Sequence, residues 1–355
     1  AEERGGFFYA TLTDIDGNKL ANQTLLFTIS GLNYTRTTND AEQASIAINL
    51  LPGTYNFDVY YNGNENYQDS KTTAECTVYS TISGNDVVKY YKNDTQYYAT
   101  FLDNQGNPLK GNVTFNINGV MYTRKTNDSG VAKLNINLLD GEYILTAMHP
   151  DTGLMYSNII TVLPTVNAED LIKVYRDSHQ YYATFLQGDG TPLKNTDVQF
   201  NVHGVFYTRT TNASGVAKLN INLEAGTYII TAIHPNPSYM HSNIIEVLGS
   251  STTAIATSDY TYVEDDTQII KATLYDQLGN VVPGQALHAT AGVTTYDSVT
   301  DDNGIATFKV YLEPGIYNIV YDFDGNSPYT SSYAYGTVTI KDASYVSFYV
   351  NNTIS

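Results

Sequence analysis

Three oxygen-bearing side chains at alternate positions, Asp14, Asp16 and Asn18, form the segment that most resembles a metal site. Alternate carboxylates of this kind open a twelve-residue calcium loop, which ends in a bidentate Glu. That Glu is missing here, so the segment favours a hairpin turn and leaves calcium as its only candidate ion. The acidic stretches 264–266 and 301–302 favour solvated loops, with calcium bound between units as the alternative. No other metal or cofactor is expected.

Two pairs of side chains recur with a different chemistry. Lys89 and Lys173 occupy equivalent positions, and so do Asn158 and Asn243. A lysine and an asparagine can join as an isopeptide bond when a buried carboxylate lies beside them. We identify no acid that recurs at a matching core position. The lysines are therefore predicted to lie on strand edges, where a charge discourages aggregation.

The residues that could act in catalysis lack partners. His149 and His234 each precede a Pro in equivalent loops, and no acid and serine recur with them, which argues against a catalytic triad or a metal site. Cys76 is the single cysteine, so the chain forms no internal disulfide and no Cys-based zinc site. We expect Cys76 to be a small buried residue, and we expect no enzyme.

Asparagines in Asn-x-Ser/Thr sequons are the candidate modification sites. There are seven of them, and a secreted protein of a glycosylating host would carry glycans at several. The sequon asparagines are Asn22, Asn33, Asn93, Asn112, Asn127, Asn212 and Asn351.

Charge and composition restrict the partners of the chain. Lys and Arg number 18 against 36 Asp and Glu in 355 residues, which gives a formal charge of -18. This charge argues against nucleic acid or an anionic membrane surface as a partner. No apolar run approaches the ~20 residues that span a bilayer. The 32 Tyr residues indicate a β-rich chain and leave a carbohydrate-binding face as an alternative use.

The chain consists of four repeats. A turn glycine recurs as Gly17, Gly106, Gly190 and Gly279, at spacings of 89, 84 and 89 residues. A second glycine, at position 53, recurs with nearly the same period. Such a period predicts a tandem array of similar units. The predicted domains are units 1–81, 82–165, 166–250 and 251–341, followed by a C-terminal strand at 342–355.

Each unit shows the pattern of strands. In the second unit, the segments 87–91, 96–103, 112–118, 120–126, 131–138, 142–148 and 155–163 alternate with turns. Apolar residues at every second position of 131–138 predict a half-buried strand. Seven short strands predict an all-β chain of four tandem immunoglobulin-like β-sandwiches. A Leu-x-x-Gly-x-Tyr segment in each unit matches the tyrosine corner, whose predicted residues are Tyr55, Tyr143, Tyr228 and Tyr317.

Three turns carry a resemblance to a known family. They are D-x-x-G-N-P-L at 103–109, T-N-D-S-G-V-A at 126–132 and L-L-P-G-T-Y at 50–55. With them the chain resembles the tandem immunoglobulin-like repeats of bacterial and methanogen adhesin-like surface proteins, over about 340 residues. The resemblance implies a secreted stalk or adhesin and brings no catalytic residues. The fourth unit departs most, with Asp297 where the second unit has Thr123.

The ends of the chain are out of phase with the repeats. The first unit lacks its first strand, and the tail at 348–353 aligns with 90–95 of the second unit. A sandwich without an edge strand exposes unpaired backbone groups, which an extended segment can cover by donor-strand complementation. A chain cut from a longer array would show the same phase. The candidate donor residues are Tyr345, Val346, Phe348, Tyr349 and Val350.

These patterns predict an extracellular structural protein at the cell surface. Its partners would be neighbouring copies joined head to tail into a filament or pilus, because a contact of this kind that does not close gives a fibre. The alternative is an adhesin stalk or binding module that attaches to a host or partner-cell surface. Neither interpretation involves nucleic acid, a membrane span or a catalytic residue.

Overall fold

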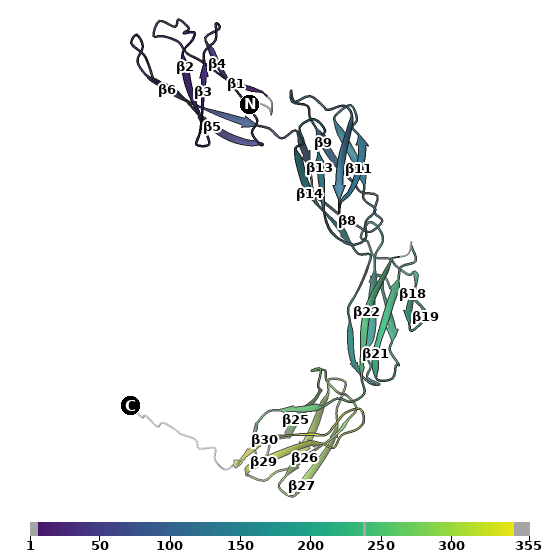
Figure 1. Cartoon of the computed structure of the whole chain (residues 1–355). Helices are drawn as coiled ribbons and strands as arrows, with labels where there is room; N and C mark the ends of the chain where they lie inside the picture. The colour runs from purple at the N-terminus through teal and green to yellow at the C-terminus, as the bar shows by residue number, and fades with distance from the viewer. Residues whose placement is uncertain (1–5, 237–238, 344–355) are drawn as a thin grey trace, which may run out of the picture. The chain divides into compact units, whose positions relative to one another are not determined.

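The computed structural model describes residues 6–236 and 239–343, which fold into β-strands and turns with no α-helix (Figure 1). Accordingly, this part of the chain holds no helix of the length and apolarity that a membrane crossing requires. The strands form eight sheets, which come in four pairs, one pair for each sequence repeat. The prediction of an all-β tandem immunoglobulin-like architecture is confirmed. The predicted domain limits stay predictions.

The chain divides into two compact units, Ala1–Pro164 with Gly188–Gly190, and Thr165–Gln187 with Thr191–Ser355. The first unit holds the first two repeats. The strands of repeat 1 are β1 (Phe7–Thr11), β2 (Thr24–Ile29), β3 (Leu32–Thr37), β4 (Gln43–Ala47), β5 (Gly53–Tyr61) and β6 (Ser70–Val78). The strands of repeat 2 are β7 (Ile82–Gly84), β8 (Val87–Tyr90), β9 (Gln96–Phe101), β10 (Asn112–Ile117), β11 (Val120–Lys125), β12 (Val131–Asn135), β13 (Gly141–Met148) and β14 (Met155–Leu163).

The second compact unit holds the other two repeats. The strands of repeat 3 are β15 (Val166–Ala168), β16 (Leu171–Val174), β17 (Gln180–Phe185), β18 (Asp197–Val202), β19 (Val205–Thr210), β20 (Val216–Asn220), β21 (Gly226–Ile233) and β22 (Met240–Leu248). The strands of repeat 4 are β23 (Thr253–Thr257), β24 (Tyr260–Val263), β25 (Gln268–Asp276), β26 (Ala286–Ala291), β27 (Thr294–Val299), β28 (Ile305–Val310), β29 (Gly315–Phe323) and β30 (Ser332–Lys341).

Repeat 2 shows the sheet order that repeats 3 and 4 share. One sheet has the order β12-β9-β7, and the other has the order β11-β10-β13-β14-β8. Along β10, Val113, Phe115 and Ile117 are buried between the sheets, while the residues that alternate with them face outward. Phe115 packs edge to face against Tyr97, with ring centroids 5.7 Å apart. Burial of this alternating apolar face supplies most of the folding free energy of a sandwich.

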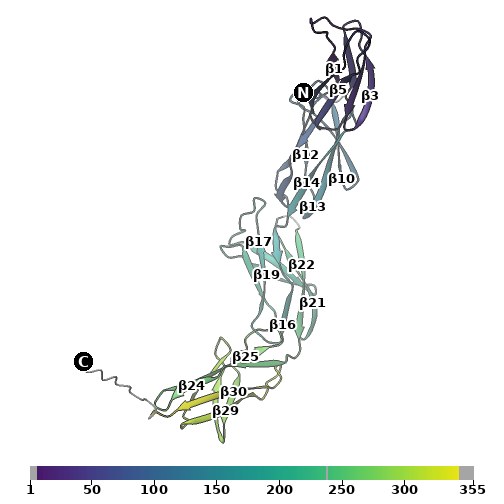
Figure 2. The same ribbon diagram turned by 90° about the vertical axis from the view of Figure 1, so that its left-hand side faces the viewer.

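The first strand of repeats 2, 3 and 4 is split between the two sheets. In repeat 2, β7 pairs antiparallel with β9, and β8 then crosses to the other sheet and pairs parallel with β14. The same pairing joins β16 to β22 and β24 to β30 (Figure 2). These repeats therefore have eight strands instead of the seven that the sequence predicts. The extra strand β7 has only three residues, too few for a periodic pattern.

Two other expectations are corrected in repeat 2. Strand β12 ends at Asn135 and does not reach Leu138, which packs beside the core only partly buried. Lys89, predicted on an exposed strand edge, is 4% exposed. The reason is that β8 is covered by the facing sheet, and the side chain of Lys89 points inward.

Repeat 1 has only six strands in the residues that the structure describes. Its sheets have the orders β1-β4 and β3-β2-β5-β6, so β1 and β6 each have a neighbour on one side only. The candidate donor residues Tyr345, Val346, Phe348, Tyr349 and Val350 lie outside the described residues, as does the sequon at Asn351.

All four predicted corner tyrosines donate a hydrogen bond to a backbone carbonyl four residues upstream. The hydroxyl-to-carbonyl distances are 2.7 to 3.0 Å. Each bond closes the turn before the strand that crosses the middle of the larger sheet. The four pairs are Tyr55 with Leu51, Tyr143 with Leu139, Tyr228 with Glu224 and Tyr317 with Glu313.

We expect Tyr143→Phe to lower the free energy of unfolding of repeat 2 by about 1 kcal/mol, because the carbonyl of Leu139 loses its phenol donor. Urea unfolding followed by the NMR signal of the Leu145 methyl groups reports this repeat alone. Tyr98→Phe is the matched control, since this tyrosine is exposed in the same repeat. Equal effects of the two substitutions would exclude a structural role for the corner.

Candidate functional site

A hydrogen-bond network fills the place where the first strand leaves one sheet for the other. In repeat 2, the Tyr97 hydroxyl donates to Asn158 Oδ1 at 2.6 Å, and Asn158 Nδ2 donates to Asp86 Oδ1 at 3.0 Å. Asp86 also accepts the backbone N–H of Ile159 at 2.9 Å. That backbone bond, with the one from Asn158, holds the pKa of the Asp86 carboxyl below its usual value. We call Tyr97, Asp86 and Asn158 the switch network.

Repeat 3 contains the same network, built from Tyr181, Asn243 and Asp170 at nearly identical distances. In repeat 4 only the carboxylate bond remains, from the Thr337 N–H to Asp259. The recurring acids Asp86 and Asp170 bond to these asparagines from exposed turn positions. The expectation that no acid recurs at a matching core position is therefore not contradicted, although the sequence patterns did not single out either acid. The two acids lie in short turns outside any apolar pattern, and their 84-residue spacing was the available signal.

A second network surrounds the buried lysine of β8. Lys89 Nζ donates to the carbonyls of Asn93 at 2.5 Å and Ile136 at 2.7 Å, and burial lowers the pKa of its ammonium. Lys173 makes the equivalent bond to Ile221 at 3.0 Å and also pairs with the Asp177 carboxylate at 3.1 Å. A buried ammonium that is fully hydrogen-bonded joins its strand to the facing sheet.

The lysines and asparagines considered for isopeptide bonds belong to these two separate networks. The Lys89 ammonium bonds to backbone carbonyls, whereas the Asn158 amide bonds to Asp86 and Tyr97. The bonds found among the described residues therefore hold the two side chains on different partners.

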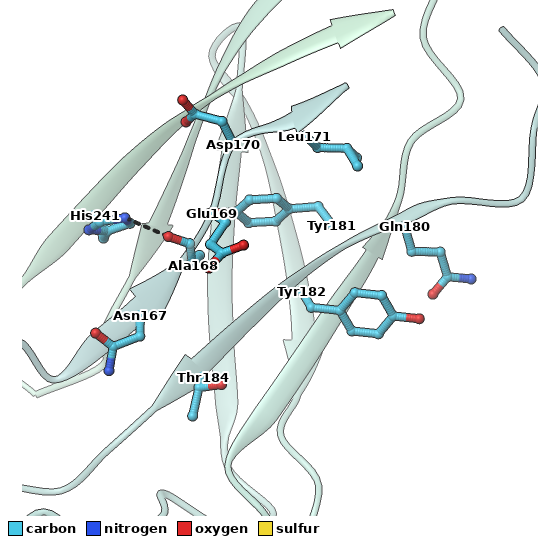
Figure 3. A pocket seen from close by; sticks show the side chains of 10 residues that line it. All are labelled: Asn167, Ala168, Glu169, Asp170, Leu171, Gln180, Tyr181, Tyr182, Thr184 and His241. Atoms are coloured by element: carbon cyan, nitrogen blue, oxygen red, sulfur yellow. Dashed lines mark hydrogen bonds between the residues drawn. The ribbon is translucent and has the colours of Figure 1, made fainter. Parts of the chain in front are cut away.

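The network of repeat 3 lies beside a surface hollow of about 550 Å³, which Asp170 and Tyr181 help to line (Figure 3). His241 Nε2 lies 3.2 Å from the Ala168 carbonyl oxygen, which accepts the hydrogen bond, and Asp170 accepts from Asn243 in the network of this repeat. Tyr182 and Gln180 flank the inward Tyr181 on β17 and point away from it. The walls of the hollow are thus fixed by the fold, and Tyr182, 56% exposed, is the aromatic side chain that a ligand would meet.

The candidate calcium loop closes on itself. Asp14 Oδ1 accepts the N–H groups of Asp16 at 3.0 Å and Asn18 at 2.8 Å, and Oδ2 accepts the Asn18 side chain at 2.9 Å. The Asn18 bonds lower the pKa of Asp14. Asp103 and Asp276 make the same backbone bonds in equivalent turns. The geometry is that of an Asx turn, and calcium binding here stays a prediction.

The acidic stretches have similar local roles. Asp266 Oδ2 accepts the N–H of Val263 at 2.8 Å, and Asp301 Oδ1 accepts those of Asn303 at 2.8 Å and Ile305 at 3.0 Å. These carboxylates shape turns in repeat 4.

The sequon asparagines of the described residues lie in turns or on outward strand positions. All are exposed except Asn93, which is partly exposed. Asn127 and Asn212 each use Oδ1 to accept two backbone N–H groups of a hairpin. Their Nδ2 atoms, which would carry a glycan, take no part in those bonds. Glycosylation stays a prediction.

The two His-Pro histidines and the cysteine are buried. His149 Nε2 lies 2.7 Å from the Leu102 carbonyl, and His234 Nε2 lies 2.7 Å from that of Leu186. Each ring also receives a backbone N–H at Nδ1. Cys76 is 3% exposed in the core of repeat 1. The hydrogen bonds of the two histidines therefore hold their loops in place, which is a structural role.

The switch network gives repeat 2 a pH dependence that Tyr97→Phe should change. Burial raises the pKa of Tyr97 to about 12, above the ~10 of an unfolded chain. The folded state therefore favours the protonated phenol. Its contribution to stability is complete below pH ~10 and falls as the pH rises toward 12.

We expect Tyr97→Phe to flatten the loss of repeat 2 stability between pH 10 and 12, relative to the unchanged chain. Urea unfolding at each pH, followed at the Leu145 methyl groups, measures the slope. Tyr98→Phe serves again as the exposed control. If the Tyr97→Phe chain lost stability as steeply as the unchanged one, the buried phenol would not be the titrating group.

The sequence relatives of the chain include a bacterial adhesin. The chain is 28% identical over 214 residues to the inverse autotransporter adhesin YeeJ of Escherichia coli strain K12. The match spans 53% of this chain and 9% of that protein. No protein-family model matches.

Solved structures with similar repeats include a Ca²⁺-stabilised adhesin of an Antarctic bacterium that binds ice, and immunoglobulin domains 1–5 of Sidekick-1. The adhesin is 15% identical with a TM-score of 0.20, covering 96% of this chain and 94% of that one. Sidekick-1 is 12% identical with a TM-score of 0.31, covering 96% and 78%. With TM-scores this low, the strand order described above carries the fold assignment. The chain is therefore a tandem immunoglobulin-like repeat protein with sequence similarity to a bacterial adhesin.

Proposed function

We propose that the chain is a load-bearing stalk segment of a cell-surface adhesin, lying outside the cell. Its repeats would hold a binding part away from the surface and transmit tension to an anchor. The sequence match to an adhesin supports the setting. The observation that carries the mechanical role is the parallel pairing of the first and last strands within a repeat.

Parallel pairing determines how a repeat resists tension. In repeat 2, β8 and β14 are in register from Val87 opposite Ile160 to Tyr90 opposite Leu163. The chain enters through the short β7, continues into β8 and leaves through β14. Tension on the two ends therefore draws these strands in opposite directions along their common axis. The hydrogen bonds between them are loaded together, in shear, and must fail together instead of one at a time.

The buried side chain on the same strand reinforces this pair. Lys89 joins β8 to the carbonyl of Ile136, just after β12 in the facing sheet. Lys173 does the same for β16. At the equivalent position of β24, the hydroxyl of Tyr262 donates to the carbonyl of Ile269. Repeats 2, 3 and 4 thus each fix the sheared strand to the opposite sheet.

We expect single-molecule stretching of the chain by its two ends to give three high-force unfolding events and one at lower force. The three events belong to the repeats with a parallel pair, and the weak event belongs to repeat 1. Lys89→Met should lower the force of one high event, because β8 loses its bonds to the facing sheet. Lys110→Met, at an exposed lysine of the same repeat, is the control.

Four events of equal force, or an unchanged force in the Lys89→Met chain, would contradict the mechanical role. Labelling of intact cells with antibodies against the chain tests its location separately. Absence of the chain from the cell surface would exclude the adhesin stalk whatever the force.

A second candidate function rests on the open edges of repeat 1. There β6 pairs with β5 alone, and β1 pairs with β4 alone, within the described residues. Phe7 and Tyr9 on β1 are 46% and 57% exposed. We propose that this repeat accepts an extended strand in the place that β8 takes beside β14. Residues 342–355 of another copy would be the donor, giving a head-to-tail filament.

We expect a labelled peptide of residues 342–355 to bind the intact chain and to raise the unfolding force of the weak repeat. A peptide of the same composition in scrambled order should do neither. If neither peptide binds, strand donation by this segment is excluded and repeat 1 must be completed by other residues of a longer protein.

A further inference from the structure

Four ionisable side chains meet on the outer face of the larger sheet of repeat 4. His288 on β26 lies between Asp297 on β27 and Asp322 on β29, and it is directly opposite both in the strand register. Asp324 follows β29 by one residue. His288 is partly exposed, with 32% of its side chain accessible. Strand pairing thus brings together residues that are up to 36 positions apart in the sequence.

The imidazole is held in one orientation. His288 Nδ1 lies 2.6 Å from Asp297 Oδ1, and Nε2 faces Asp324 Oδ2 at 3.5 Å. One ligand atom each from His288, Asp322 and Asp324 lies within 4.8 Å of the other two. When Nδ1–H donates to Asp297, the lone pair of neutral Nε2 points toward the other two carboxylates. A carboxylate behind a histidine fixes the tautomer in this way at metal sites.

The other repeats carry different residues at the same register positions. Repeat 2 has Thr114 opposite Thr123 and Met148, and repeat 3 has Gln199 opposite Thr208 and Ile233. In repeat 1, Leu26 lies opposite Thr35 and Tyr60. The fold of a repeat therefore does not require the cluster. Repeat 4 alone has replaced a face of neutral side chains with one histidine and three acids.

We propose that His288, Asp322 and Asp324 bind a zinc-like divalent transition metal ion, with Asp297 orienting the histidine. One imidazole nitrogen and two carboxylate oxygens, completed by water, form a set that suits Zn²⁺. The charges of the cluster are consistent with this set, because three carboxylates surround one imidazole and together attract a cation. The ion joins β26 to β29 and the turn after it.

The arrangement distinguishes this ion from calcium. Calcium takes six to eight oxygen ligands, whereas the central group here is a nitrogen donor. Tetrahedral zinc with bonds of about 2.0 Å sets its ligand atoms about 3.3 Å apart. Asp324 and Asp322 lie close enough to reach these positions by side-chain rotation, since both are accessible to solvent. The site lies on the surface, so it can bind zinc from the surrounding solution after the repeat has folded.

The test is calorimetric titration of the intact chain with zinc chloride at pH 7. We expect one site whose affinity falls by at least about tenfold in His288→Gln, and by about 10–100-fold in Asp297→Asn if Asp297 orients the ligand. Cobalt in place of zinc should give the visible absorption of a bound ion, lost in the same variants.

The matched control is His203→Asn. His203 is an exposed histidine of repeat 3 with a φ of 52°, and repeat 2 has Asn118 at the same position with a φ of 51°. This variant should bind zinc like the unchanged chain. Equal zinc binding by His288→Gln and the unchanged chain would overturn the proposal, as would no binding by either.

Discussion

The parallel hydrogen bonds between the second half of the first strand and the last strand are the constraint on which each complete repeat depends. They require the first strand to leave one sheet and join the other, and the switch network stabilises that crossing. Tyr97 reaches from β9 to Asn158 on β14, and Asp86 in the turn between β7 and β8 accepts the N–H of Ile159 on the same strand. The buried lysine then fixes β8 to the facing sheet. The crossing thus explains why the polar side chains of Tyr97, Asn158 and Lys89 are buried. Each has hydrogen-bond partners there, without which its burial would cost stability.

The repeats share their interior and differ on their outer faces. On the larger sheet, repeat 2 exposes Ile144 opposite Ile159, and repeat 3 exposes Ile229 opposite Ile244. Repeat 4 has Asn318 opposite Thr337 in that place and gathers its acids around His288 farther along the sheet. Outer positions bear little on the sandwich core, so they are free to differ. A tandem array built from one fold can therefore carry different surface chemistry on each repeat.

Much of the fold was predictable because it repeats and is periodic. The spacing of the turn glycines predicted four units. The apolar residues at alternate positions, such as Ala132 and Leu134, predicted a strand with one buried face, and both residues are buried. The split first strand was not predictable, since β7 is too short to show a period. Lys89 was misjudged because a lysine suggests an exposed edge, whereas three carbonyls hold it inside. Of the cluster at His288, the sequence singled out only Asp297, as a departure from the other repeats. The other members could not be connected with it, because they become neighbours only through strand pairing.

Hydrogen–deuterium exchange of the native chain tests the central claim most directly, namely that β8, β16 and β24 are closed in parallel against the last strands of their repeats. The account predicts that the backbone amides linking each parallel pair exchange as slowly as those within the same larger sheet, and that the outer-edge amides of β6 in repeat 1 exchange fast. Exchange of the parallel pairs at the rate of an unstructured peptide, with the rest of each repeat protected, would contradict it.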